Sequence, residues 1–358
     1  MQGTEPLWKF WFNKIMVAFR KIAVFFALIF LVMPVPREGR AGEPEAGGNR
    51  RTRLQQAQTW MYQLQGIESD REIEALADTD YPLLVVEPDC DYNDNSFDCR
   101  RMMVQTLKTT STGARRLVLA YVDIGQAESW RTYWKKHWVA PTFKKRGKPG
   151  FLVTPDPDGW EGCYPVAYWD QRWKDIWVGA DGIISKLAKL GYDGVYMDWV
   201  EAYDDDRVRE AARKAKINPE LEMIRFIEEI GKVGKKTTPD FLVVPQNAPF
   251  LIDAAPDRYA KAIDAIAVED TWFHGAGDAD WGDPEAGDLR RRHDGQWSTR
   301  RRLLQYRKYL ARGLPVFSVD YCIKPENAAM VYREARKAGL RPLVTRVSLS
   351  RITETPPR

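Results

Sequence analysis

Short runs of β-branched and aromatic residues alternate with helical segments from residue 58 onward. Eight such runs occur, at residues 59–67, 81–87, 116–124, 194–200, 241–246, 265–270, 314–321 and 342–347. Helical segments separate them, for example at residues 220–232, 300–312 and 325–338. This alternation indicates βα units and a parallel sheet rather than a β-sandwich. Eight units in about 300 residues predict an α/β fold of the (β/α)8 TIM-barrel type.

A doubly wound sheet is the alternative α/β fold, because it also alternates strands with helices. Its Gly-rich phosphate-binding turn, GxGxxG, does not follow the first predicted strand. The chain has 358 residues, of which 44% are hydrophobic, so it is long enough to bury one large core. The barrel is therefore the preferred prediction.

The first 41 residues have the features of an export signal. Four basic residues precede an apolar run at residues 22–35, and small residues follow at Gly39 and Ala41. The run is shorter than the roughly 20 residues of a membrane-spanning helix. We expect residues 1–41 to be a signal peptide, or an uncleaved anchor that forms the protein's only membrane contact. The protein is then secreted or periplasmic, with a linker at residues 42–57 and the barrel at 58–358.

Net charge argues against binding nucleic acid through bulk electrostatics. The chain has 54 Lys and Arg residues and 50 Asp and Glu residues. Residues 1–41 hold six of the basic and two of the acidic residues, which leaves 48 of each for the remainder. We expect no nucleic-acid partner, because such domains carry a strong basic excess.

Four cysteines in an exported protein can form disulfides. Cys90 and Cys99 flank an Asp- and Asn-rich loop, whereas Cys163 and Cys322 lie far apart in sequence. The expected pairs are Cys90 with Cys99 and Cys163 with Cys322, and four free thiols are the alternative. The three histidines form no HExxH or HxH pattern, so we expect neither a metal site nor a cofactor.

Acidic residues stand at the ends of several predicted strands, where a TIM barrel places its chemistry. Asp123, Asp198, Glu269 and Asp320 occupy such ends. Side chains alternate between the two faces of a strand, so apolar neighbours face the helices and Asp198 and Glu269 face the barrel mouth. Taken alone, each acid could instead be a helix cap or an ion-pair partner.

Two carboxylates across a barrel mouth suit glycoside hydrolysis. One protonates the leaving oxygen, while the other attacks the sugar or activates water. We therefore expect Asp198 and Glu269 to be catalytic. Aromatic side chains stack on sugar rings, and Trp169, Trp199 and Trp272 are the expected platforms.

Five segments of the chain, taken in order, resemble the motifs of glycoside hydrolase family 114. They are residues 121–128 (YVDIGQAE), 168–170 (YWD), 191–201 (GYDGVYMDWVE), 246–248 (QNA) and 268–270 (VED). The family comprises TIM-barrel endo-α-1,4-polygalactosaminidases and their extracellular relatives, and the resemblance runs from about residue 58 to 350. It implies that Asp198 is a nucleophile and Glu269 an acid/base of a retaining mechanism.

The strand ends and the resemblance together give the expected substrate-binding residues. These are Tyr121, Asp123, Glu128, Trp169, Asp170, Tyr196, Trp199, Glu201, Gln246, Asn247, Asp270, Trp272, Asp320 and Tyr321. So many acids would attract a cationic polymer such as partly deacetylated galactosamine polysaccharide. The expected function is an exported glycosidase acting on an amino-sugar polysaccharide. A non-catalytic polysaccharide-binding barrel of an envelope or export system is the alternative.

Overall fold

A computed structural model describes residues 49–88, 97–291 and 295–353. Within these ranges no helix is long and apolar enough to span a membrane. The predicted signal or anchor at residues 1–41 lies outside them. So do Cys90 and the side chain of Cys99, and their disulfide therefore stays a prediction.

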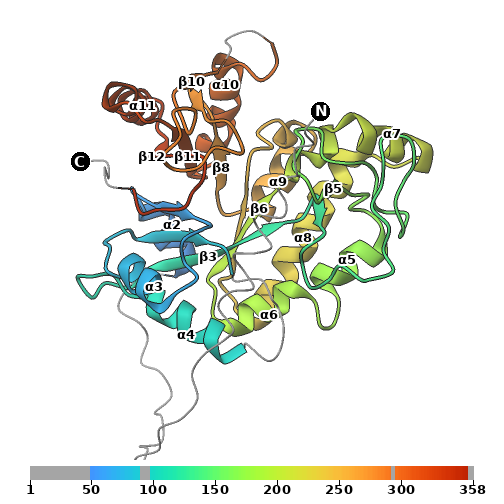
Figure 1. The fold of residues 1–358 in the computed structure, drawn as a ribbon, viewed down its shortest axis with the longest axis horizontal. Helices are drawn as coiled ribbons and strands as arrows, with labels where there is room; N and C mark the ends of the chain where they lie inside the picture. The colour runs from blue at the N-terminus through green and yellow to red at the C-terminus, as the bar shows by residue number, and fades with distance from the viewer. Residues whose placement is uncertain (1–48, 89–96, 292–294, 354–358) are drawn as a thin grey trace, which may run out of the picture. The chain divides into compact units, whose positions relative to one another are not determined.

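Eight parallel strands follow one another in chain order, as expected for a TIM barrel (Figure 1). They are β1 (Met61–Gln63), β2 (Leu83–Val86), β3 (Leu117–Asp123), β6 (Gly194–Asp198), β7 (Leu242–Pro245), β8 (Ile266–Glu269), β11 (Val316–Tyr321) and β12 (Arg341–Thr345). A parallel bridge between Gln246 and Ala267 joins β7 to β8. On the other side the indole of Trp60, just before β1, donates to the carbonyl of Arg341 in β12 at 2.9 Å. The strands thus form the predicted (β/α)8 TIM barrel.

Helices connect successive strands. The connections contain α3 (Asp70–Ala77), α4 (Phe97–Leu107), α5 (Gln171–Val178), α6 (Ile183–Leu190), α7 (Asp206–Ala215), α8 (Pro219–Thr237), α9 (Pro256–Ala262), α10 (Thr299–Leu310) and α11 (Pro325–Lys337). Short elements lie in the connections that follow β3, β6, β7 and β8. They are the hairpin β4 (Gln126–Glu128) and β5 (Cys163–Pro165), the 3-10 helices η2 (Val200–Asp204) and η3 (Leu251–Asp253), and the hairpin β9 (Phe273–His274) and β10 (Leu289–Arg290).

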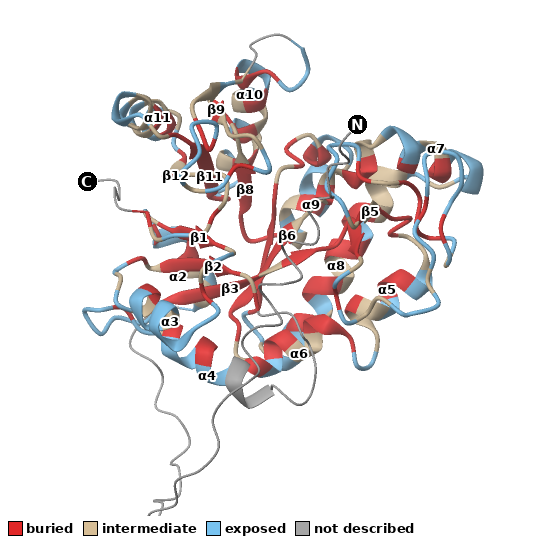
Figure 2. Cartoon of the chain, in the orientation of Figure 1, coloured by how far each residue is buried: buried red, intermediate tan, exposed pale blue. Residues whose placement is uncertain are grey.

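The longest of these helices, α8, shows how the sequence specifies a barrel helix. Asn218 caps its start by accepting a hydrogen bond from the backbone of Leu221 at 2.8 Å, and Pro219 occupies the first turn. Buried residues such as Ile227 and Ile230 recur at helical spacing. The strands are buried along most of their length, whereas the helices combine buried and exposed faces (Figure 2).

The predicted linker is wrong at its carboxyl end, because residues 50–56 form helix α2 (Arg50–Gln56). Leu54 is fully buried, and the guanidinium of Arg50 binds the buried carboxylate of Asp193 at 2.7 Å. The ammonium of Lys108 binds the same carboxylate at 2.5 Å. Arg51 of the same helix pairs with Asp264 at 3.5 Å. One buried leucine and two ion pairs leave no apolar period in the sequence, which is why the helix was missed.

The predicted disulfide between Cys163 and Cys322 is also wrong, since both are buried free thiols. Cys163 lies in β5 opposite Glu128 of β4. Cys322 packs in a separate apolar cluster with Phe273 and Val331. Burial raises the pKa of each thiol, so both resist ionisation.

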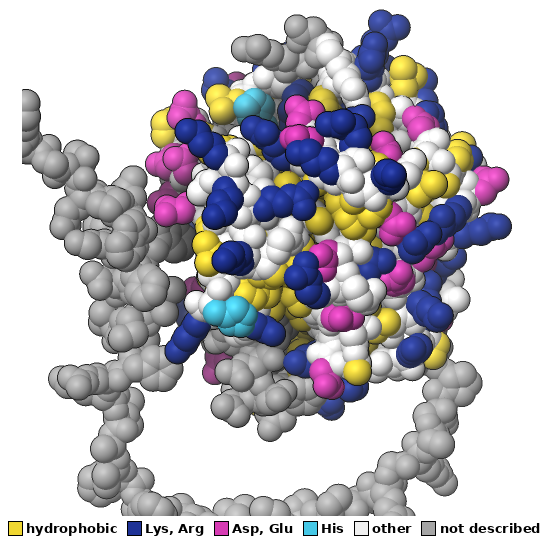
Figure 3. Space-filling view, turned by 90° about the vertical axis from the view of Figure 1, so that its right-hand side faces the viewer, with side chains coloured by type: hydrophobic (Ala, Val, Ile, Leu, Met, Phe, Trp, Pro, Cys, Tyr) yellow, Lys and Arg dark blue, Asp and Glu magenta, His cyan; other side chains and the backbone are white. Residues whose placement is uncertain are grey.

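The surface reflects the charge balance of the sequence. On the face turned toward the reader in Figure 3, basic and acidic side chains are interspersed with apolar patches. This arrangement limits any long-range field of one sign on that face.

Candidate active site

Asp198 ends β6 and is partly buried. Its Oδ2 accepts a hydrogen bond from the hydroxyl of Tyr121 at 2.6 Å, and its Oδ1 accepts one from the backbone N–H of Trp199 at 2.7 Å. Burial, followed by the charge of Glu269, raises the pKa of Asp198 to about 6, although both hydrogen bonds oppose the rise. The carboxylate is therefore oriented from two sides.

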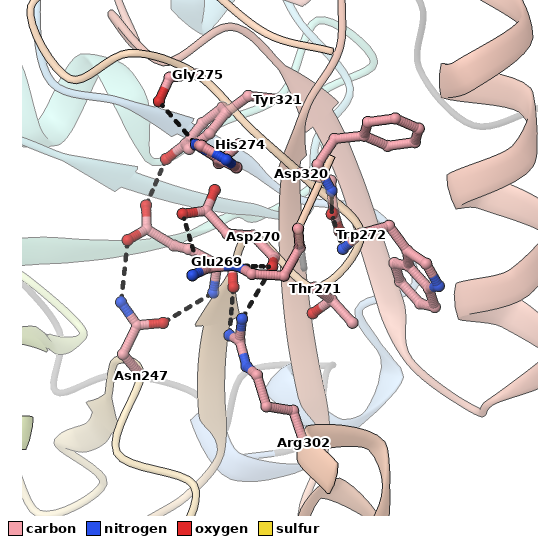
Figure 4. Close-up of polar contacts among 12 residues, drawn as sticks. Asn247, Glu269, Asp270, Thr271, Trp272, His274, Gly275, Arg302, Asp320 and Tyr321 are labelled. Atoms are coloured by element: carbon pink, nitrogen blue, oxygen red, sulfur yellow. Dashed lines mark hydrogen bonds and ion pairs between the residues drawn. The ribbon is translucent and has the colours of Figure 1, made fainter. Parts of the chain in front are cut away.

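Glu269 ends β8 and is also partly buried (Figure 4). Its Oε2 accepts from the side-chain amide of Asn247 at 3.1 Å, and its Oε1 accepts from the hydroxyl of Tyr321. Its backbone N–H donates to Asn247 Oδ1 at 2.9 Å. Burial, followed by the charge of Asp270, raises the pKa of Glu269 to about 7, against the hydrogen bonds that favour the ionised form.

The two carboxylates both act on one pair of tyrosines. Burial, and then charges that include those of Asp198 and Glu269, raise the pKa of Tyr62 and of Tyr196, whose ring centroids lie 5.0 Å apart. The hydroxyl of Tyr196 has no hydrogen-bond partner among the described residues. Tyr62 was missed in the sequence, where its aromatic ring on the first strand was the only available signal.

Three consecutive parallel strands are each followed by a non-glycine residue whose backbone lies in the left-handed region. These are Trp199 after β6, Asn247 after β7 and Asp270 after β8, with φ of 52°, 60° and 53°. Such conformations cost about 1–3 kcal/mol each and cluster at functional sites. Gly125 permits the first of them, because a Cβ there would lie 2.0 Å from the carbonyl oxygen of Trp199.

Two arginines, Arg302 and Arg291, support the end of β8. The guanidinium of Arg302 donates to the carbonyl of Asp270 at 2.9 Å and to the carbonyl of Glu269 (Figure 4). Arg291 binds the carboxylate of Asp270 at 3.0 Å. Burial raises the pKa of Asp270 to about 6, and the two guanidinium groups oppose this rise. Sequence reasoning missed both arginines, because they lie in basic runs typical of a solvated face.

Asp320 and Tyr321 show how one step along a strand separates two roles. Asp320 is fully buried and accepts from the backbone N–H groups of Trp272 at 2.6 Å and Phe273 at 2.8 Å. Burial raises its pKa to about 8. Tyr321 points to the opposite face and reaches Glu269. Tyr321 therefore lies at the site. Asp320 instead binds the backbone of the connection that follows β8.

Hydrogen bonds and ion pairs fix Asp123 at the end of β3 and the acids of the connection that follows it. Asp123 accepts from two backbone amides of its own turn, at 2.8 and 3.1 Å. Glu128 binds Arg131 at 2.6 Å, and Arg131 also binds Glu87 at 2.9 Å. Burial raises the pKa of Asp123 and of Glu128. Asp170 caps α5 and binds the guanidinium of Arg172.

Four further expected residues are Glu201, Gln246, Trp169 and Trp272. Glu201, in η2, has one buried oxygen without a partner among the described residues, and burial and the charge of Asp198 raise its pKa. Gln246 also has a buried, unpartnered oxygen in this part of the chain. Trp169 packs edge-on against Tyr168, with ring centroids 5.0 Å apart. Trp169 and Trp272 are partly exposed, and no hydrogen bond among the described residues joins either side chain to Asp198 or Glu269.

The site is therefore a carboxylate pair positioned by hydroxyl, amide and backbone donors. Within the described ranges, no group of three or more His, Cys, Asp or Glu side chains is arranged to hold a metal ion. Both pKa values lie near neutrality, and the higher one belongs to Glu269. Such a pair can hold one proton on one carboxyl while the other stays ionised, which is the requirement of acid-assisted glycoside cleavage.

Comparison with known proteins agrees with this chemistry. The model of glycoside-hydrolase family GH114 matches residues 42–357. The chain belongs to family GH114. An uncharacterised protein of Deinococcus radiodurans is 30% identical over 309 residues, which cover 86% of this chain and 87% of that protein. Uncharacterised protein MJ1477 of Methanocaldococcus jannaschii is 31% identical over 228 residues, covering 60% of this chain and 57% of that protein.

Solved structures share the fold of this GH114 member. Ega3 of Aspergillus fumigatus, in complex with galactosamine, aligns with a TM-score of 0.53 and 14% identity, over 82% of this chain and 93% of that one. The glycoside hydrolase domain of PelA from Pseudomonas aeruginosa aligns with a TM-score of 0.52 and 14% identity, over 82% and 96%. At 14% identity, this structural similarity is evidence for the barrel fold alone.

Proposed function

We propose that this GH114 protein is an exported, retaining endo-glycosidase that cleaves a galactosamine-type polysaccharide. The observation that carries the proposal is the Asp198 and Glu269 pair at the carboxyl ends of β6 and β8. Each carboxylate has its own set of donors, and their pKa values differ. This arrangement suits two carboxylates with separate roles.

In the first step, ionised Asp198 attacks the anomeric carbon while protonated Glu269 gives its proton to the departing glycosidic oxygen. The products are a sugar with a free hydroxyl and a glycosyl ester on Asp198. In the second step, ionised Glu269 takes a proton from water, and the resulting hydroxide equivalent attacks the same carbon. Asp198 leaves as a carboxylate, so one water is consumed for each bond cleaved.

The surrounding residues serve these steps. Tyr121 and the Trp199 N–H stabilise negative charge on Asp198, which keeps the nucleophile ionised. Asn247 and Tyr321 fix the orientation of Glu269 for both proton transfers. The further carboxyl of Glu201 lies close enough for the charge of Asp198 to affect its pKa, and it provides a partner for a substrate amine. Galactosamine bound by the structurally similar Ega3 supports this substrate class.

The catalytic proposal is tested with Asp198→Asn and Glu269→Gln, which nearly preserve side-chain volume. Purified proteins are incubated with α-1,4-linked galactosamine oligosaccharides of different acetylation, and products are identified by mass spectrometry. Each variant should lose at least 100-fold of turnover, on the order expected for a catalytic carboxyl. Glu210→Gln, a partly exposed acid on α7, is the matched control and should keep full turnover.

Stereochemistry and rescue separate the two roles. Proton NMR of early products should show retained anomeric configuration. On an aryl glycoside with a good leaving group, Glu269→Gln should form the glycosyl ester and release a glycosyl azide when azide is added. Asp198→Asn should give no such product. Inverted products would refute the nucleophilic role, and binding without turnover by the unaltered protein would point to the non-catalytic polysaccharide-binding alternative.

Export is a separate part of the proposal. The four basic residues before the apolar run, and the run itself at residues 22–35, support export. Expression of the full chain in its native host, followed by fractionation and mass measurement of the amino terminus, tests both export and cleavage. Recovery of full-length protein in the cytoplasm would contradict this part and leave the catalytic proposal standing.

A further inference from the structure

A hollow of about 450 Å³ lies beside the carboxylate pair and does not include it. Its walls come from η2 after β6, from the start of α8, from the turn around η3 after β7, and from Gln296 before α10. Residue 200 begins η2, two positions after Asp198, and Phe250 follows Asn247 by three positions. These elements continue from the carboxyl ends of β6 and β7, the barrel end at which the catalytic pair also lies. The volume is within the range of small-molecule sites.

One carboxylate in this hollow lacks a compensating charge. Asp204 binds Arg209 at 2.8 Å, and Asp253 binds Lys308 at 2.6 Å. Glu220 lines the same hollow and forms no ion pair with any other described residue. It stands in the first turn of α8. The hollow therefore offers a single unpaired negative charge to a ligand.

The other walls provide an apolar surface and a buried hydroxyl. Leu221 and Phe250 line the hollow, and Trp297 fixes the Phe250 ring edge-on at 5.1 Å. Tyr203 also lines it and is 5% exposed, and its hydroxyl has no hydrogen-bond partner among the described residues. The nearby hydroxyl of Tyr168, in contrast, donates to a backbone carbonyl at 2.7 Å. An unpaired buried hydroxyl destabilises the protein, and a ligand hydroxyl would offset this cost.

We propose that this hollow is a second saccharide-binding site, which holds a cationic hexosamine unit of the polymer outside the catalytic centre. Glu220 accepts the ammonium group, Phe250 packs against the C–H face of the pyranose ring, and a sugar hydroxyl pairs with Tyr203. A carboxylate next to an aromatic ring distinguishes an amino sugar from its neutral N-acetyl form. The proposal deepens the proposed function and depends on it for the class of polymer.

The test uses the full chain carrying both Asp198→Asn and Glu269→Gln, so that the oligosaccharide is not cleaved. Isothermal titration measures binding of an α-1,4-galactosamine hexasaccharide and of its fully N-acetylated counterpart. Adding Glu220→Gln should weaken binding of the cationic hexasaccharide about fivefold to tenfold and leave the N-acetylated one unchanged. Adding Phe250→Ala should weaken both. Adding Glu210→Gln, a partly exposed acid on α7 that pairs with Lys214, should change neither.

The outcomes separate the two proposals. If Glu220→Gln and Phe250→Ala bind both hexasaccharides as the Glu210→Gln protein does, or if the cationic one does not bind at all, the second site is refuted. Thermal melting checks that each variant is folded, and Glu220→Gln is a polar change that keeps side-chain size. Loss of cationic binding on Glu220→Gln, in a protein whose unaltered form never cleaves the hexasaccharide, would refute the glycosidase and retain the site.

Discussion

Removing the Tyr321 hydroxyl gives the most direct test of how the site controls its proton. Tyr321→Phe keeps the ring and removes the hydrogen bond to Glu269 Oε1. A hydrogen bond to a charged group contributes about 1.5–3 kcal/mol, and 1.36 kcal/mol corresponds to one pKa unit. This bond favours the ionised form, so its loss should raise the pKa of Glu269 by about 1–2 units from its value of about 7.

The direction of the activity change follows from the proposed role of Glu269 as the general acid. A general acid works when protonated, so kcat/KM falls as pH rises through its pKa. In the Tyr321→Phe protein this alkaline limb should move to higher pH by about 1–2 units. The assay is kcat/KM on galactosamine oligosaccharides between about pH 4 and 10. Tyr168→Phe, which removes a hydroxyl bound to a backbone carbonyl, is the control and should leave the limb in place.

The companion change, Tyr121→Phe, should affect the other limb. Tyr121 donates to Asp198, whose pKa is about 6. In the proposed mechanism this pKa sets the acid limb, because the nucleophile works when ionised. Loss of this bond should raise the pKa of Asp198 and move the acid limb to higher pH. An unmoved alkaline limb in Tyr321→Phe, or the same limb moving in both variants, would refute the assignment of roles to Asp198 and Glu269.

Three further predictions concern the scaffold. Asp193→Asn should lower the free energy of unfolding by about 3 kcal/mol in urea titration, because it leaves two cations without their buried partner. Gly125→Ala should displace the Trp199 backbone and reduce kcat, whereas Gly150→Ala, which has open space for its Cβ, should not. Cys163 and Cys322 should resist thiol reagents in the native protein and react once it is unfolded, as measured by mass spectrometry, since both are buried free thiols.

Each of the eight strands overlaps a run predicted from the sequence. Their signal is local, because β-branched runs and helical spacing are visible within about ten residues. Helix α2 and the state of Cys163 and Cys322 were not predictable in this way. The helix depends on one buried side chain, Leu54, and on two ion pairs with residues far along the chain. One of them joins Arg50 to Asp193, which are 143 residues apart. The tertiary fold keeps the two thiols apart, and the spacing of the cysteines in the sequence does not reveal this.

Strand ends and the family resemblance predicted the Asp198 and Glu269 pair, and also its donors Tyr121, Asn247 and Tyr321. The arginines at the end of β8 were not predicted. Arg302 belongs to a run of three arginines, of which Arg300 and Arg301 are exposed and only Arg302 turns inward to the carbonyls of Glu269 and Asp270. All three positions carry arginine, so residue type alone does not distinguish them. The inward orientation depends on the position of each residue around α10 relative to β8, and therefore on the assembled barrel.

The acids at the strand ends differ in their partners rather than in their chemistry. Asp320 accepts hydrogen bonds from backbone amides, and Glu128 is bound by a guanidinium, so neither is free to act on a ligand. Asp198 and Glu269 are held mainly by hydroxyl and amide donors, which orient a carboxylate without supplying a compensating positive charge. Their charge therefore remains available to an oxocarbenium-like centre or a substrate amine. This difference separates the strand-end acids with backbone or guanidinium partners from the two acids to which we assign catalysis.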